Sequence, residues 1–205
     1  QILDREIPEQ FLSDGGHFEL SPMYQAIVLG DICDLVHLAD CSGLGELKER
    51  IHGWHAVVNR GLDWLAAMSH PDGRIAFFND AACGIAPALE AINAYATSLG
   101  CRAKQAALIN HCCDRKISWQ WLPYSGYCRV DMPDGGVALL DLAPIGPDYL
   151  PGHGHADTLS FELSLFGQRL FVNSGTSQYG EDGERQRQRG TAAHNTVEVD
   201  GQNSS

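Results

Sequence analysis

The chain has 205 residues, 44% of them hydrophobic and 20% charged, which is enough to bury a core in one or two domains. Its net charge of −12 argues against a general nucleic-acid-binding surface, because such surfaces need an excess of Lys and Arg. No apolar run is long enough to cross a membrane. The sequence has neither an initiating Met nor a signal segment, so we expect an internal piece of a longer protein.

Cysteine spacing excludes some metal and redox motifs. Seven cysteines are an odd number, and none forms a C-x-x-C pair, which argues against a zinc finger or a thioredoxin-like motif. Most of them lie among apolar residues, as small buried side chains do, and weakly favour reduced thiols. They are Cys33, Cys41, Cys83, Cys101, Cys112, Cys113 and Cys128.

The first part of the chain has the 3.6-residue period of helices, predicted over residues 21–39, 46–65 and 87–99. Ser21 and Pro22 form a helix start, with Ser as the N-cap and Pro at the first helical position. Gly100 is suited to end the third helix.

From about Trp119 the period changes to 2, as in β-strands. Strands are predicted over residues 127–132, 137–142, 157–166, 169–173 and 195–199. The first two flank Pro133-Asp134-Gly135-Gly136, and the next two flank Gly167-Gln168, so both pairs are predicted hairpins. Helices followed by antiparallel strands predict an α+β protein in two segregated parts, with a boundary near 115–122.

Two histidines two residues apart, His153 and His155, precede the strand predicted over 157–166. In an extended chain such residues share a face, so both imidazoles can converge on one metal or one substrate. The strand that follows alternates apolar and polar residues, and we expect its polar face to turn toward whatever the histidines hold. The alternative is a pair of surface histidines in a Gly-rich loop.

Tyr24 lies in the first turn of the first predicted helix, after a loop that contains His17. The helix N-terminus favours negative charge, so a phenol there is eased toward phenolate and suits proton transfer. Alternatively, Tyr24 packs in the helical wall. His17 either orients the loop or is a structural residue.

Three further residues lie at predicted strand ends: His155, Asn173 and His194. Their spacing is compatible with convergence at one rim of a sheet, which is a weak metal signal. Arg185 and Arg189 are the cations that an anionic ligand would need, although neighbouring acidic residues also fit a solvated, mixed-charge loop.

Together these segments resemble the heparinase II/III family of polysaccharide lyases. The segments are DGGHFELSPMYQ (14–25), FND (78–80), PGHGHADTLSFEL (151–163), VNSGTSQYG (172–180) and RQRGTAAHNTVEVDG (187–201). The resemblance implies an (α/α) toroid followed by an antiparallel β-sandwich, with the active site in the cleft between them. The chain would then hold the last toroid helices in residues 1–118 and the first sandwich strands in residues 119–205, with both domains truncated.

The resemblance also implies a chemistry, β-elimination at a 4-linked uronic acid. The carboxylate beside C5 must be neutralised, a base must remove the C5 proton, and an acid must protonate the departing O4. Tyr24 matches the catalytic tyrosine, which can serve both steps when both groups lie on one face of the sugar. His153 matches the histidine opposite it. Candidates to bind the anionic polysaccharide are His17, Arg185 and Arg189, while His155, Asn173 and His194 match the ligands of a structural zinc.

Two departures from the family pattern matter. The family usually has Asp where this chain has Asn173, and losing a charged ligand weakens zinc binding, leaving a metal-free site held by hydrogen bonds as the alternative. The family's substrate-neutralising Asn-His pair lies upstream of the tyrosine motif. We therefore expect these residues alone to be inactive. The resemblance implies a periplasmic or extracellular location in the cell envelope, while the cysteines point mildly the other way.

Two other functions remain open from the sequence. One is a carbohydrate-binding or exopolysaccharide-assembly protein that keeps the fold without the chemistry, for which the Asn173 departure leaves room. The other is a metallohydrolase or cupin-type site at His153 and His155. The second is disfavoured because a metallohydrolase H-x-H usually opens an α/β barrel, whereas this one follows a block of helices.

Overall fold

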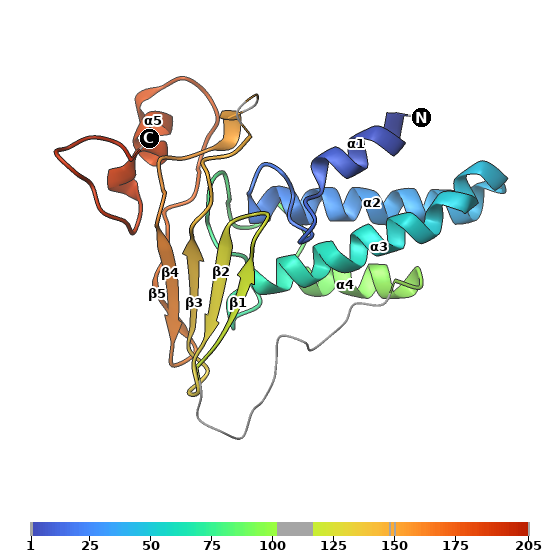
Figure 1. Ribbon diagram of the computed structural model, residues 1–205, viewed down its shortest axis with the longest axis horizontal. Coiled ribbons are helices and arrows are strands. Elements are labelled where there is room, and N and C mark those ends of the chain that lie inside the picture. The colour runs from blue at the N-terminus through green and yellow to red at the C-terminus, as the bar shows by residue number, and fades with distance from the viewer. Residues whose placement is uncertain (1, 102–116, 148, 150, 205) are drawn as a thin grey trace.

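The computed structural model describes residues 2–101, 117–147, 149 and 151–204. Within these residues, four α-helices precede a five-stranded sheet and a short fifth α-helix (Figure 1). The helices are α1 (Ile2–Gln10), α2 (Pro22–Ser42), α3 (Gly45–Ala67), α4 (Leu89–Ser98) and α5 (Gly183–Arg189). The strands are β1 (Ser118–Leu122), β2 (Tyr127–Asp131), β3 (Val137–Asp141), β4 (Phe161–Leu165) and β5 (Gln168–Phe171). The predicted order of helices followed by antiparallel strands is confirmed.

The helical part is built on a hairpin of α2 and α3. The side chain of Ser21 accepts a hydrogen bond from the backbone N–H of Tyr24, Pro22 opens α2, and Gly43 ends it in the left-handed conformation. The apolar faces of α2, α3 and α4 share one core, which includes Leu29, Val58 and Ile92. These helices match the three predicted ones. Helix α1 was not predicted, and it contains Pro8.

The sheet is a meander in the order β1-β2-β3-β4-β5, with every neighbouring pair antiparallel. Both predicted hairpins are confirmed. The β4–β5 turn is Phe166-Gly167, with the positive φ values (54° and 73°) that a type I′ turn needs at both positions. It lies one residue before the predicted Gly167-Gln168, and Gln168 opens β5. The predicted domain boundary falls partly on residues 102–116, which lie outside the described residues.

The sheet stands across the end of the α2–α3 hairpin (Figure 1). A second core, which includes Trp64 and Phe78 from the helical part and Tyr127 and Leu139 from the sheet, fills this junction. In β4 the polar residues face inward: Glu162 and Ser164 are buried. The strand therefore turns its polar face toward the junction, where Glu162 and Ser164 bond His70 rather than His153 or His155.

One predicted strand is absent from the structure. Residues 195–199 do not form a strand; Val197 and Val199 are exposed, and the segment makes a single isolated bridge, Val199 to Gln202, among the described residues. Alternation alone does not make a strand when no ladder partner is available. The segment with Arg185 and Arg189, considered above as a mixed-charge loop, forms α5, capped by the Asp182 side chain.

Among the described helices, none combines the length and apolarity needed to span a membrane. The cysteines inside the described residues are free thiols, namely Cys33, Cys41, Cys83, Cys101 and Cys128. The remaining two, Cys112 and Cys113, lie outside the described residues.

Candidate active site at the junction of helices and sheet

Three loops meet where α2 begins, beside the sheet. Backbone hydrogen bonds tie them together: Asp80 N–H donates to the carbonyl of His153 (3.3 Å) and Thr176 N–H donates to the carbonyl of Ala81 (3.0 Å). Gly175 makes this approach possible, because it has φ of 64° and a Cβ there would collide with the Ala81 carbonyl. The loop before β4 and the loop after β5 are thus both fastened to the segment around Asp80.

Two residues with left-handed backbone fix this junction. Leu20, just before the α2 cap, has φ of 58°, and Asn79, just before Asp80, has φ of 53°. The Asn79 side chain donates to the Leu20 carbonyl (3.1 Å) and accepts from the backbone N–H of His155 (3.0 Å). Asn adopts this conformation more readily than Leu does, and such outliers persist where surrounding contacts hold them. One buried amide therefore links the start of the Tyr24 helix to the histidine loop.

Asp80 is the centre of the polar cluster, and its side chain is completely buried. His153 Nδ1 lies 2.8 Å from Oδ2 and His155 Nε2 lies 2.8 Å from Oδ1. Arg185 pairs with both oxygens through its two terminal nitrogens, at 2.7 Å for Nη2 to Oδ2. Burial alone would raise the pKa of Asp80, but the hydrogen bonds from His155, Arg185 and His153 outweigh it and lower that pKa to about 2.

The structure brings the two predicted catalytic residues together. The rings of Tyr24 and His153 have centroids 4.5 Å apart, and the Tyr24 hydroxyl lies 2.9 Å from the hydroxyl of Tyr179. The Glu19 carboxylate lies 3.8 Å from Nε2 of His153, and burial raises its pKa. The His153 side chain keeps 30% exposure, so this group is open to a ligand.

The surroundings of Tyr24 oppose the predicted easing toward phenolate. Burial, followed by the hydrogen bond with Tyr179, raises the pKa of Tyr24 above its ordinary value. Tyr24 is therefore a neutral phenol at physiological pH, and it holds a proton that it can donate.

His17 is placed differently from the prediction that it binds substrate. It is 3% exposed, its backbone N–H donates to the Gln25 side chain (2.6 Å), and its ring packs edge-on against Phe11 and Phe18. Burial lowers its pKa to about 4. A buried neutral imidazole of this kind shapes the loop rather than contacting a polyanion.

The two predicted substrate-binding arginines also hold loops. The guanidinium of Arg185 is buried against Asp80 and also donates to Thr176 Oγ1 (2.9 Å). Nε of Arg189 donates to the Gly154 carbonyl inside the histidine loop (2.8 Å). The charge of Arg185 is thus already paired with Asp80 in the interior, while its predicted role in binding substrate stays a prediction. Arg189 fastens the loop that carries His153.

The predicted metal ligands are only partly brought together. His155 Nδ1 and His194 Nε2 face each other at 3.3 Å, and burial lowers the pKa of His194 to about 4. Two imidazole nitrogens on one tetrahedral zinc lie about 3.3 Å apart, so this pair fits a metal. The amide of Asn173 is engaged elsewhere, donating to Ser160 Oγ (3.4 Å) and accepting from Asn195 N–H (3.3 Å). Within the described residues no three His, Cys, Asp or Glu side chains gather as metal ligands, so the donor set is incomplete.

A second buried polar group, not predicted from the sequence, lies deeper in the junction. His70 bonds Ser164 Oγ through Nδ1 and Glu162 through Nε2, each at 2.7 Å. Glu162 also accepts from the backbone N–H groups of Phe77 (2.8 Å) and Asn173 (3.0 Å). The side chains of His70 and Glu162 are completely buried, so this cluster joins β4 to both neighbouring loops and does not meet ligands.

Three residues of the site escaped sequence reasoning: Glu19, Asp80 and Tyr179. Glu19 and Tyr179 lie inside motifs quoted for the resemblance, as does Asp80 in the FND segment, but no local pattern assigned them a role. Tyr179 is 155 residues from Tyr24 along the chain, and only the fold brings their hydroxyls together.

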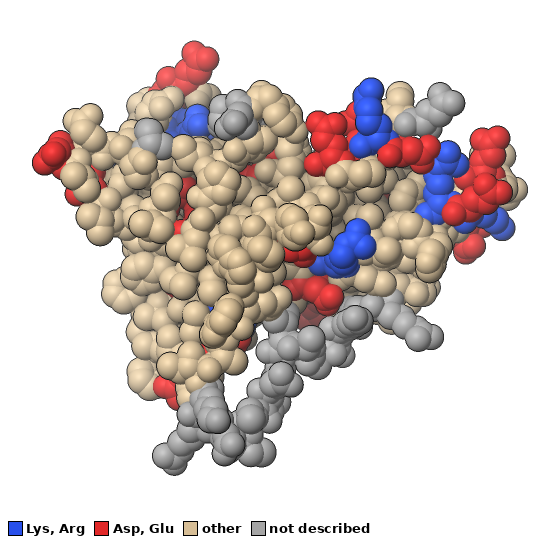
Figure 2. Space-filling model, viewed as in Figure 1, with Lys and Arg blue, Asp and Glu red and all other residues tan. Residues whose placement is uncertain are grey.

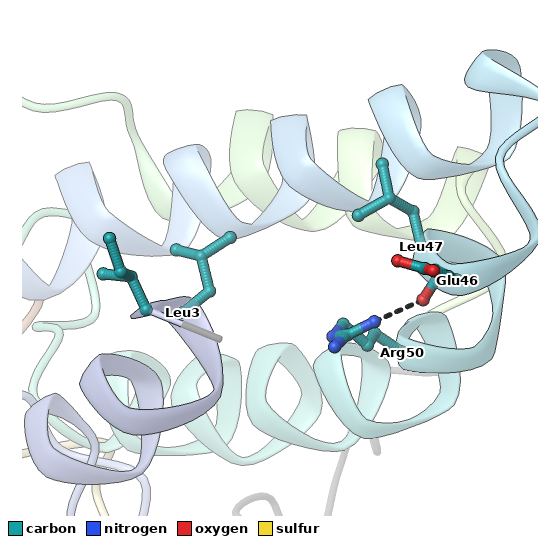
Figure 3. Close-up of a pocket in the computed structure, with 5 residues that line it drawn as sticks. Leu3, Glu46, Leu47 and Arg50 are labelled. Atoms are coloured by element: carbon teal, nitrogen blue, oxygen red, sulfur yellow. Dashed lines mark hydrogen bonds between the residues drawn. The ribbon is translucent and has the colours of Figure 1, made fainter.

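A shallow groove lies elsewhere, at the end of the helical part far from the sheet. It is lined by Ile2 and Leu3 of α1 and by Glu46, Leu47 and Arg50 of α3 (Figure 3). Charged side chains of both signs gather over this helical end, whereas most of the surface seen over the strands is uncharged (Figure 2). The groove has no histidine or tyrosine and is separate from the site above.

Comparison with known proteins gives a consistent family. A model described as Heparinase II/III N-terminus matches residues 1–101, and one described as Heparinase II/III-like, C-terminal, matches residues 115–205. A heparin-sulfate lyase from Bacteroides stercoris is 28% identical over 218 residues, which cover 98% of this chain and 31% of the relative.

Two solved structures share the fold. A heparinase III with methylated lysines has a TM-score of 0.74 at 24% identity, over 98% of this chain and 32% of its own. Heparan sulfate lyase HepC from Pedobacter heparinus has a TM-score of 0.72 at 23% identity, over 98% of this chain and 32% of its own. The chain thus spans about a third of the length of these relatives.

Proposed function

Because the chain belongs to the heparinase II/III-like family, we propose that it supplies part of the active site of a polysaccharide lyase. The proposed reaction is β-elimination in a polysaccharide that contains uronic acid. The relatives whose names include heparin or heparan sulfate act on anionic polysaccharides, which supports this substrate class. The observation that carries the proposal is the contact of Tyr24 with His153 at the junction, with ring centroids 4.5 Å apart.

In the proposed mechanism Tyr24 is the general acid. Its raised pKa keeps the phenol protonated, so it can pass a proton to O4 as the C4–O4 bond breaks. The electrons of the C5–H bond form the C4=C5 double bond. When the C5 proton and O4 lie on one face of the sugar, the Tyr24 oxygen can serve both proton transfers only if it starts as the phenolate, which its raised pKa disfavours.

His153 is the proposed base when those groups lie on opposite faces. Its Nδ1 faces the ionised Asp80, which can only accept a hydrogen bond, so Nδ1 carries the proton and Nε2 keeps a lone pair. Nε2 lies on the side of Glu19. The C5 proton would move to Nε2 while Tyr24 protonates O4.

The test is an absorbance assay for the unsaturated product, with the full-length protein and a panel of uronate polymers. Tyr24→Phe should abolish turnover by removing the acid while keeping polymer binding. Tyr95→Phe is the matched control, because its hydroxyl donates to Asp34 on the helical part (2.8 Å), away from the junction. Full turnover in Tyr24→Phe would contradict the role of Tyr24. Polymer binding without turnover by the wild type on every polymer would favour the carbohydrate-binding alternative.

We further propose that any zinc at this site would be held by His155 and His194 and would bind weakly. The third family position is the neutral amide of Asn173, whose oxygen already accepts from Asn195 N–H. Asn173→Asp restores a carboxylate and should raise zinc affinity, measured by competition with a chelator. Equal affinity in both proteins would contradict the assignment of Asn173 to the donor set.

A further inference from the structure

One buried carboxylate is shared by two imidazoles that the sequence assigns to different tasks. Oδ2 of Asp80 lies 2.8 Å from Nδ1 of His153, and Oδ1 lies 2.8 Å from Nε2 of His155. The bidentate pair with Arg185 keeps Asp80 ionised and occupies the remaining lone pairs. The carboxylate therefore cannot rotate without breaking several charge-assisted hydrogen bonds.

An ionised carboxylate has no proton to give, so both histidines must donate to it. Neutral His153 then carries its proton on Nδ1 and keeps a lone pair on Nε2, the nitrogen nearest Glu19. His155 carries its proton on Nε2 and presents the lone pair of Nδ1 toward His194. The same carboxylate thus selects opposite tautomers in two histidines two residues apart.

The main chain fixes Asp80 before any ligand arrives. Its N–H donates to the His153 carbonyl (3.3 Å), and its own carbonyl accepts from the Ser21 hydroxyl (2.6 Å). Asn79 precedes it in the left-handed conformation. Arg185 is held in turn by Thr176. Groups from four separate segments therefore define where the carboxylate lies.

We propose that Asp80 is a positioning residue that sets the tautomer and ring orientation of His153 and His155 together, with Arg185 as its clamp. For catalysis this rests on the proposed lyase function; for the tautomers it rests on geometry alone. The reacting imidazole and the supporting His155–His194 pair are then two ends of one hydrogen-bonded unit. A change at His153 therefore alters the hydrogen bonding of His155, and the reverse, because both bond the same carboxylate.

The first test uses the wild-type full-length protein and needs no turnover. Nitrogen-15 spectra of the imidazoles, assigned with His153→Gln and His155→Gln, should show protonation on Nδ1 for His153 and on Nε2 for His155. The opposite tautomer at either residue would overturn the proposal. This result stands whether or not the protein proves to be a lyase.

The second test is Asp80→Asn, an isosteric change that places an NH2 group where one oxygen accepts. At least one imidazole then loses its acceptor and should change tautomer, and kcat should fall by about 10²- to 10⁴-fold, as when a base is held in the wrong tautomer. KM should change by less than about threefold, because Asp80 is buried and does not reach the polymer.

Asp141→Asn is the matched control. Asp141 is also buried at the junction but contacts Ala143 N–H rather than an imidazole, and burial together with Asp157 raises its pKa, so a neutral amide replaces it well. Both tautomers and kcat should be unchanged in this variant. Unchanged tautomers and kcat in Asp80→Asn would overturn the proposal. If no uronate polymer is cleaved by the wild type, the lyase function fails while the spectra still decide the role of Asp80.

Discussion

The two faces of the sheet differ in a way that separates structure from chemistry. A row of apolar residues crosses the outer face in register from strand to strand: Trp119, Val130, Ala138, Leu163 and Phe171. The inner face of the same strands mixes Leu139 with polar groups such as Arg129 and Glu162, and it packs on the helical part. On the outer face Trp119 is 71% exposed, while Glu162 on the inner face is completely buried.

This contrast shows that the buried polar side chains of the sheet lie on its inner face. Two polar groups of the inner face have partners on the helical side: Glu162 bonds His70, and Arg129 donates to the carbonyls of Ala67 and Ser69. Such hydrogen bonds offset the free-energy cost of burying a polar side chain, and their geometry fixes how the sheet packs on the helical part. The outer face has no such pattern among the described residues.

The largest effect is expected from Glu162→Leu, which removes the central polar group of the inner face. An apolar residue of similar size should cost about 3–5 kcal/mol in free energy of unfolding, because it leaves His70 and two backbone N–H groups buried without an acceptor. Urea denaturation would measure the change. A loss below about 1 kcal/mol would show that the inner polar cluster does not hold the parts together.

A pH titration of stability should detect the buried histidines His17 and His194. Burial lowers the pKa of His17 to about 4, below the value of about 6.5 that it regains on unfolding. Between these values the unfolded chain binds a proton that the folded chain does not, so stability falls as pH is lowered, by about 1.4 kcal/mol per pH unit. His194 acts with the same sign.

His17→Gln should reduce the dependence of the free energy of unfolding on pH by the contribution of one histidine. Urea unfolding at about pH 4.5, 5.5 and 6.5 would measure it, because these values span the window between the folded and unfolded pKa of His17. The wild type and the variant should converge in slope above the ordinary pKa of His. A slope that His17→Gln leaves unchanged would show that the buried imidazole is not the source.

The smallest effect is expected on the outer face. Trp119→Thr replaces an exposed residue on the edge strand β1 and should change the free energy of unfolding by about 0.5 kcal/mol or less, since Thr also favours strands. Thermal unfolding would measure it beside Glu162→Leu. A large loss would mean that the outer row supports the sheet by itself.

The elements that could be predicted from sequence are those fixed by local chemistry. The Ser21-Pro22 start, the apolar stripe of α3 and the Gly-containing hairpin turns each determine their own backbone. The predicted strand at 195–199 failed because pairing depends on a partner elsewhere in the chain. Alternation does not report whether that partner exists.

For the site as well, local motifs were predictable and long-range partners were not. Motif resemblance identified Tyr24 and His153, and the fold places them in contact. The burial of Arg185 was not predicted because its partner, Asp80, lies 105 residues away, and an arginine beside acidic residues looks exposed in sequence. Long-range partners of buried charges are the part that local patterns cannot supply.

The Ser21 hydroxyl has a consequence for how such proteins can diverge. It accepts a hydrogen bond from the backbone N–H of Tyr24 and donates one to the backbone carbonyl of Asp80. One atom therefore sets the spacing between the residue that carries the phenol and the residue whose carboxylate bonds both histidines. The α2–α3 hairpin between them turns at its far end, near Gly43. Insertions or deletions there would change the length of the hairpin while the reacting groups kept their alignment, so the helical wall is free to evolve around a fixed chemical centre.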